Sequence, residues 1–229
     1  MADEIIIADN IRLLVRRSAR ARRMTLRVPR DGGNVVLTLP PRVPLHEGRA
    51  FAESKSEWVR SAVARVPAPS IVRIGAVIPV GGRKLIVTGA DTKVVKIEDE
   101  RLCVPQNRSP GALVQAFLKH LAHRHLVASC DRHAQALGRD YRAIVLRDTR
   151  SRWGSCSSDQ RLMFSWRLAM APVAVLDYVA AHEVAHLAHM DHSNRFWNAV
   201  QNLLPDYAKH RAWLRAHGSE LMAWKFRDI

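Results

Sequence analysis

The feature of the sequence that most limits its fold is a pair of histidines inside an apolar helical segment. The segment opens at Pro172, and within it the chain reads His182-Glu183-Val184-Ala185-His186. Residues four apart lie on the same face of an α-helix, one turn above the other. Ionisable groups in an apolar run are unfavourable unless they have a partner. The fold must therefore supply a partner for both imidazoles.

A metal ion is the partner that this spacing favours. Two imidazoles one turn apart can bind one ion at the usual Zn–N distance of about 2.0–2.1 Å. Glu183 projects beside them and can reach a water bound to the metal without binding the metal itself. This is the HExxH arrangement, in which the glutamate is the general base of a zinc hydrolase. The sequence predicts a Zn²⁺ site with His182 and His186 as ligands and Glu183 as the catalytic base.

A catalytic zinc ion usually has a third protein ligand and an open position for water. We expect His192 to be that ligand, because it follows the probable end of the helix and directly precedes Ser193, which should cap the next helix. Its distance from His186 along the chain matches the HExxHxxxxxH signature, although that signature has glycine where this chain has His189. His189, which would point along the helix, and Glu220, the only glutamate downstream, are the weaker alternatives.

The cysteines do not offer a competing metal site. Cys103, Cys130 and Cys156 are scattered and form no CxxC pair. They indicate neither a disulfide framework nor a cysteine zinc finger. Histidine and carboxylate are therefore the ligands to consider, and the cysteines are expected to be small, partly buried residues.

The remaining patterns predict an α+β fold. The first half is rich in strand patterns, with a hairpin from alternating residues 24–28 and 35–39, a helix over about 45–65 and further strands between 71 and 104. The second half predicts a helix from Ser109-Pro110 to Gly138, a β-hairpin of residues 143–147 and 162–168, and helices after Pro172, Ser193 and Asp206. We therefore expect a β-rich N-terminal region with one helix over residues 1–109, and a helical catalytic region over 110–229 with the hairpin next to the active-site helix.

Charge and hydropathy bear on partners and location. The chain has 36 Lys/Arg against 21 Asp/Glu, a net charge of +15, and residues 11–30 contain eight arginines and no acid. The electric field of so many positive charges attracts nucleic acid or nucleotides. Alternatively, the positive charge only keeps the protein soluble. No uncharged apolar run reaches the about 18 residues of a membrane span, and the N-terminus is the reverse of a secretory signal. We expect a cytoplasmic protein with no membrane association.

The motifs around the histidines resemble the YgjP-like family of predicted zinc metallohydrolases, which is related to the SprT and WLM groups of zincin-type metallopeptidases. The resemblance rests on RWGSCS (residues 152–157), FSWRLAMAP, DYVAAHEVAHL, DHSNRFW and LPDY, and extends more loosely over the whole chain. It implies a zincin-like, minimal metallopeptidase fold for the second half, with zinc on His182, His186 and His192 and Glu183 as base. It also implies an edge strand beside the metal helix, for which residues 164–167 are the candidate.

The leading prediction for function is a zinc metallopeptidase acting on polypeptide. The alternatives are a metal-dependent hydrolase of nucleotide phosphoanhydrides and a nucleic-acid-associated protein with a zinc site. A structural zinc site is normally closed by four ligands, so the three found here favour catalysis. Tyr178, Tyr207 and Arg152 are the candidates for stabilising the oxyanion, and Trp153 and Trp166 are expected to pack in the core.

Overall fold

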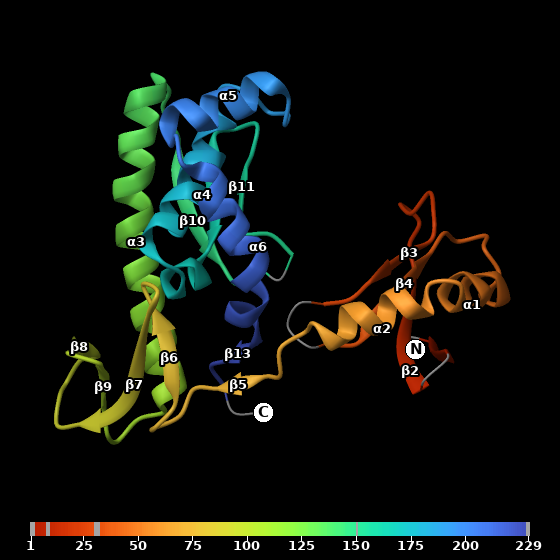
Figure 1. The fold of residues 1–229 in the computed structure, drawn as a ribbon, viewed down its shortest axis with the longest axis horizontal. Helices are drawn as coiled ribbons and strands as arrows, with labels where there is room; N and C mark the ends of the chain where they lie inside the picture. The colour runs from red at the N-terminus through yellow and green to blue at the C-terminus, as the bar shows by residue number, and fades with distance from the viewer. Residues whose placement is uncertain (1–2, 8–9, 30–32, 150, 228–229) are drawn as a thin grey trace. The chain divides into compact units, whose positions relative to one another are not determined.

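The computed structural model describes residues 3–7, 10–29, 33–149 and 151–227. The chain forms two compact units, Met1–Pro69 and Ser70–Ile229 (Figure 1). This division differs from the boundary predicted at residue 109. The reason is that the strands between residues 77 and 105 share one hydrophobic core with the helices that follow, so buried side chains such as Leu85 and Leu102 belong with Val114 and Leu118.

The first unit is built on a four-stranded sheet in the order β1-β2-β4-β3. Its strands are β1 (Asp3–Ile7), β2 (Ile11–Arg17), β3 (Thr25–Arg27) and β4 (Val35–Leu39). β3 and β4 pair antiparallel, which confirms the predicted hairpin pairing, although part of its turn lies outside the described residues. β2 and β4 pair parallel, and Leu13, Leu37 and Leu39 are completely buried beneath the helices of this unit.

The helix predicted over 45–65 is in fact two helices, α1 (Leu45–Glu53) and α2 (Ser56–Ala64). They separate at Ser54, whose hydroxyl donates a hydrogen bond to the carbonyl of Phe51 at 2.8 Å. Serine side chains compete in this way with the backbone bonds that would continue a helix. Within α2 the buried residue is Val59, whereas the neighbouring Trp58 is 49% exposed.

The second unit begins with a four-stranded sheet in the order β6-β7-β9-β8, and a long helix packs beside it. The strands are β6 (Val77–Val80), β7 (Arg83–Ala90), β8 (Lys96–Glu98) and β9 (Arg101–Pro105). Helix α3 (Pro110–Leu137) has the predicted bounds, because proline occupies its first turn and Gly138 ends it in the left-handed conformation at φ 65°. A two-residue parallel pair, β5 (Ser70–Ile71) with β13 (Trp224–Lys225), joins the two ends of this unit.

A three-stranded sheet in the order β10-β12-β11 lies next to the helices, and it differs from the predicted hairpin in two respects. The strands are β10 (Ala143–Arg147), β11 (Gly154–Cys156) and β12 (Arg161–Ser165). β10 and β12 are parallel, so they do not form the predicted hairpin; the antiparallel partner of β12 is β11, inside the segment predicted as a connection. β12 is the central strand, and from Trp166 to Met170 the chain is a 3-10 helix, η2, so residues 164–167 are not the edge.

Helices complete the second unit. They are α4 (Val173–Ala185), α5 (Asn194–Leu203) and α6 (Tyr207–Ala223). Helix α4 is apolar on most of its surface because it packs against α3, α5, α6 and β11. The expected packing of Trp153 and Trp166 in this core is confirmed, since they are 9% and 0% exposed. Over the described part of the chain, no helix combines the length and hydropathy needed to cross a bilayer.

Candidate metal centre

The end of α4 brings two histidines together, and the turn to α5 adds a third. His182 lies in the last turn of α4, and His186 directly follows its last residue. The chain then reverses before α5 begins at Asn194, which returns His192 to the same place. One ring nitrogen from each of the three histidines lies within 4.8 Å of the others. Helix periodicity and one reversal of the chain are enough to assemble the cluster.

The donor atoms fit a metal ion. Nε2 of His192 lies 3.2 Å from Nε2 of His182. Two imidazole nitrogens bound to one tetrahedral zinc ion at about 2.0–2.1 Å lie about 3.3–3.4 Å apart, which is close to this separation. Nδ1–H of His186 donates to the carbonyl of His189 at 2.9 Å, and this bond leaves Nε2 of the same ring with its lone pair available. Such an outer hydrogen bond is what orients metal-binding histidines.

The environment of His182 and His186 favours the neutral form of both rings, as metal binding requires. Burial, together with the neighbouring charges of His186, His192 and Arg211, lowers the pKa of His182 to about 3. Burial likewise lowers the pKa of His186 below its ordinary value. Nδ1 of His182 is buried without a hydrogen-bond partner among the described residues. The lowered pKa values favour neutral rings at His182 and His186, and a neutral imidazole can offer a lone pair to a metal ion.

The two weaker alternatives for the third ligand lie elsewhere. His189 follows α4 in the turn and contributes its backbone carbonyl to His186, as described above. Glu220 is exposed on α6, and its Oε1 lies 3.2 Å from Nδ1 of His217. Neither belongs to the cluster of ring nitrogens.

Glu183 is buried beside the histidine cluster. It is 5% exposed, and burial raises the pKa of its carboxyl to about 8. The positive charge of Arg152 and a hydrogen bond from the backbone N–H of Cys156 oppose this rise without cancelling it. The carboxylate is thus held by β11 on one side and carried by α4 on the other.

The strand β11 forms the edge of the sheet at this site. The N–H of Ser165 donates to the carbonyl of Trp153 at 2.8 Å, and the N–H of Ser157 donates to the carbonyl of Arg161 at 3.0 Å. In an antiparallel pair the backbone groups of alternate residues point away from the partner strand. The intervening Gly154 and Cys156 therefore direct their N–H and carbonyl groups to the open side, which agrees with the bond from Cys156 to Glu183.

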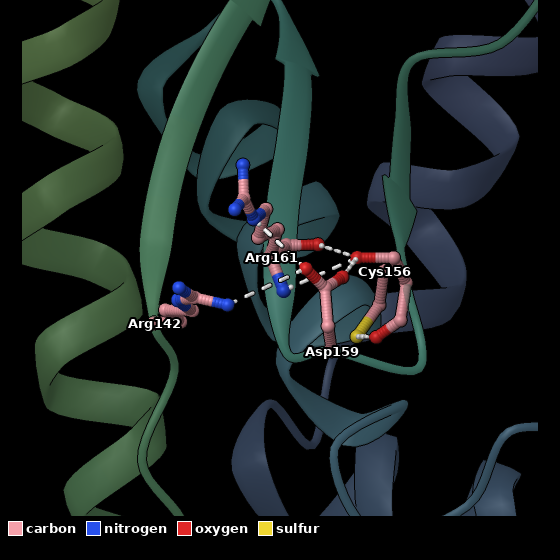
Figure 2. Close-up of polar contacts among 5 residues, drawn as sticks. Arg142, Cys156, Asp159 and Arg161 are labelled. Carbon is pink, nitrogen blue, oxygen red and sulfur yellow. Dashed lines mark hydrogen bonds and ion pairs between the residues drawn. The ribbon is translucent and has the colours of Figure 1, made fainter.

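A tight turn fixes the far end of β11, as Figure 2 shows. Asp159 accepts a hydrogen bond from the Ser157 hydroxyl at 2.5 Å and forms ion pairs with Arg161 at 2.8 Å and Arg142 at 3.9 Å. The Ser157 hydroxyl also accepts from the backbone N–H of Arg161 at 3.2 Å. These bonds tie the turn to β10 and β12 and so hold Cys156 at the cavity. Burial raises the pKa of the Cys156 thiol to about 11, and the thiol does not belong to the cluster of converging donor atoms.

The histidines, Glu183 and β11 enclose one cavity of about 250 Å³. Its walls are formed by side chains and backbone of Gly154, Ser155, Cys156, His182, Glu183, His186, Met190 and His192. Tyr178, Tyr207 and Arg152, the residues considered for the oxyanion, do not line it. The residues that sequence reasoning missed are those of β11 and Met190; glycine followed by two small residues within a strand was the available signal for a close approach.

Two aromatic side chains pack against the histidines. Phe196 is completely buried, and its ring centroid lies 4.4 Å from that of His186 in a stacked arrangement. Trp197 lies 5.7 Å from His182 and 5.9 Å from His192, both measured between ring centroids. These contacts restrict the rotation of the imidazoles and so preorganise the cluster.

Comparison with known proteins gives one match by family. The family described as YgjP-like, metallopeptidase domain, matches residues 22–217. Among curated proteins, no match to the chain is found. Among solved structures, the crystal structure of the metallopeptidase zymogen of Pyrococcus abyssi abylysin aligns with a TM-score of 0.37 and 17% identity, over 39% of this chain and 90% of that one.

Proposed function

The chain belongs to the YgjP-like family of metallopeptidase domains, and from this premise we propose that it is a zinc-dependent peptidase. One observation carries the proposal: the nitrogens of His182, His186 and His192 converge in the cavity that also holds Glu183. Three converging imidazoles with a buried carboxylate beside them are the parts that hydrolysis by an activated water requires.

Zinc is the proposed ion, with the three histidines as its ligands. An all-nitrogen donor set suits zinc better than calcium or magnesium, which prefer oxygen. When bound, zinc lowers the pKa of a coordinated water to about 7 and polarises the scissile carbonyl. The surrounding Phe196 and Trp197 pack against the cluster and hold the rings in place.

Glu183 is the proposed general base. Its carboxylate accepts a proton from the attacking water and delivers it to the nitrogen of the departing amine. The N–H of Cys156 orients that carboxylate, and the positive charge of Arg152, together with that of a cation held by the three histidines, would favour its ionised form. Both residues therefore act on Glu183, and Arg152 is assigned this electrostatic role in place of contact with the oxyanion.

The open side of β11 is the proposed binding site for the substrate backbone. Gly154 and Cys156 direct their backbone groups away from β12. Apart from the Cys156 N–H, which bonds to Glu183, these groups can pair with an extended peptide that adds to the sheet as a further strand. Such pairing would draw the peptide along the cavity wall formed by Gly154, Ser155 and Cys156. A metal helix, a third ligand after the helix and an adjacent edge strand together support a zincin-like arrangement for this half of the chain.

A parallel activity screen tests the proposal. Purified protein loaded with one equivalent of zinc is incubated with unfolded polypeptides and, separately, with nucleoside triphosphates, and the Glu183→Gln variant is the control. We expect polypeptide cleavage by the wild type, and a loss of about 10²–10⁴-fold in turnover in the variant with its zinc retained. Cleavage confined to the triphosphates would replace the peptidase proposal with the phosphoanhydride alternative, and equal rates in the variant would exclude Glu183 as the base.

A further inference from the structure

A shallow groove runs along the exposed side of α6. This α6 groove has a volume of about 490 Å³. It is lined by Tyr207, Ala208, Arg211, Ala212, Arg215 and Ala216. Arg211 and Arg215 lie one helical turn apart, which places their Cβ atoms about 5–6 Å from each other. The groove is therefore a small surface with two guanidinium groups at neighbouring positions.

The α6 groove adjoins the histidine cluster through Trp197. The Trp197 ring lies 5.9 Å from the ring of His192, and Cζ of Arg211 lies 4.4 Å from the same Trp197 ring. Tyr207 stacks on Trp197 at 5.5 Å. The indole thus contacts His182 and His192 as well as two residues that line the groove, Tyr207 and Arg211, so the Arg211 guanidinium is one aromatic ring removed from the candidate metal centre.

The two arginines are available to an anion. Within the described part of the chain, neither Arg211 nor Arg215 has an acidic group in ion-pair distance, and no acidic residue lines the groove. Lys209 on the same helix differs, because it is paired with Asp206. Stacking on Trp197 holds the Arg211 guanidinium in a defined place, which lowers the entropy lost when a ligand binds.

We propose that the α6 groove binds an acidic side chain of the polypeptide substrate and gives the enzyme a preference for Asp or Glu near the scissile bond. The inference rests on the peptidase function proposed above. A guanidinium matches a carboxylate in a paired, charge-assisted hydrogen bond. An extended chain advances about 3.3 Å per residue, so a side chain about three residues from the cleaved bond can span the width of Trp197 and reach Arg211.

A peptide fits this site better than nucleic acid does. Duplex DNA carries one charge per about 1.7 Å of helix axis, so its binding sites neutralise many phosphates in a row. The α6 groove offers two cations among alanines, which suits one or two carboxylates. Because the groove lies close to the histidine cluster, one peptide molecule can place an acidic side chain in the groove and its scissile bond at the cluster.

Matched peptides test the preference by kinetics. Two fluorogenic peptides differ only in carrying Glu or Gln two and three residues from the scissile bond. We expect kcat/KM of the zinc-loaded wild type to be about tenfold higher for the Glu peptide, and the ratio to fall to about one in Arg215→Gln and in Arg211→Gln. Lys119→Gln/Arg124→Gln removes two exposed charges from α3 and should keep the ratio. Equal rates for both peptides in the wild type would overturn the proposal.

Affinity measurements distinguish an error in the proposal for the groove from an error in the proposed peptidase function. The Glu183→Gln background and fluorescein-labelled versions of the same peptides give affinities without cleavage, and Arg215→Gln is added to that background. Tighter binding of the Glu peptide that depends on Arg215 supports the groove even if neither peptide is cleaved. Equal binding of both peptides overturns the groove and leaves any peptidase activity intact. A loss of affinity in Arg215→Gln for single-stranded oligothymidylate, with none for the Glu peptide, would assign the groove to nucleic acid instead.

Thermal unfolding keeps both readouts interpretable. Arg215 is exposed, so its replacement should leave the melting temperature unchanged. Arg211→Lys retains the charge but loses the planar stack on Trp197, and it should restore part of the preference that Arg211→Gln lacks. A preference that disappears equally in the lysine variant would point to packing against Trp197, and it would overturn the assignment of charge recognition to Arg211.

Discussion

A Cβ atom built on Gly154 would lie 2.5 Å from Oε1 of Glu183 and 2.6 Å from its Cγ. No side chain fits at Gly154 unless the carboxylate or strand β11 moves. The edge strand can therefore approach the candidate base closely only because this position is glycine. The same close approach lets the neighbouring N–H of Cys156 bond to the carboxylate.

Gly154→Ala should reduce catalysis without removing the metal. The added methyl displaces Glu183 from its position, and a displacement of about 1 Å in a catalytic group can lower the rate about 100-fold. Steady-state kinetics measures the loss, and elemental analysis should still give about one zinc per chain. Ser158→Ala, in the exposed turn after β11, serves as the control and should retain full activity. Unchanged kcat in Gly154→Ala would show that the carboxylate position does not matter.

His192→Ala and His189→Ala should differ sharply in zinc affinity. Removal of a direct ligand is expected to weaken binding by more than the about 10–100-fold that loss of an outer hydrogen-bond partner causes. His189 contributes to the cluster only through its backbone carbonyl on His186, which alanine retains. Competition with a zinc chelator measures both affinities. Similar affinities in the two variants would contradict His192 as the third ligand.

Arg167→Met should destabilise the fold. The Arg167 side chain is 10% exposed, and its Nε lies 2.7 Å from Oδ1 of Asp148. Its Nη1 also donates at 3.0 Å to the carbonyls of Leu221 and Trp224, which ties η2 to the end of α6. Breaking a buried charged network that also satisfies backbone carbonyls lowers the free energy of unfolding by about 3 kcal/mol. Urea denaturation measures the loss, and Arg124→Met, at an exposed position, is the control. Equal urea midpoints for the two variants would contradict the prediction.

Asp177 should make stability depend on pH. Burial raises the pKa of this carboxyl, but the hydrogen bond and charge of His133, with help from Ser129 and Arg132, outweigh burial and leave the pKa below its usual value. A carboxyl with a lowered folded-state pKa stabilises the fold above its unfolded pKa of about 3.9, and that contribution is lost as the pH falls through the folded value.

Comparison of the wild type with Asp177→Asn isolates this contribution. The variant should be less stable by about 1–3 kcal/mol at neutral pH, because it loses charge-assisted bonds between α3 and α4. The gap should narrow as the pH falls from the unfolded-state pKa of about 3.9 toward the lower folded-state pKa, because the unfolded wild-type chain takes up the proton first. Urea denaturation at several pH values measures the gap, and a constant gap would rule out ionisation of Asp177 as its source.

Local signals explain which parts of the molecule were predictable. The bounds of α3 follow from Pro110 and Gly138, because a proline at the start and a glycine at the end act within one turn of chain. The positions of His182 and His186 follow from helix periodicity alone. The position of His192 was predictable because the connection between the two helices is short, and a short connection allows few conformations.

Long-range pairing explains the rest. The parallel arrangement of β10 and β12 depends on the path of residues 148–160 between them, and the hydrophobic pattern of each strand does not encode it. The role of Gly154 depends on its approach to α4, a contact between distant segments. Arg167 was read as part of a strand because its burial depends on carbonyls more than fifty residues away.

The β5–β13 pair closes the second unit into a ring. Ser70 lies opposite Trp224 and Ile71 opposite Lys225, so the segment that enters this unit and the segment that leaves it are neighbours. A new pair of chain ends could therefore be opened elsewhere, for example in the exposed turn after β11, while residues 225 and 70 are bridged by a short linker. The order of the elements along the chain could therefore be changed while the geometry of the histidine cluster stays the same.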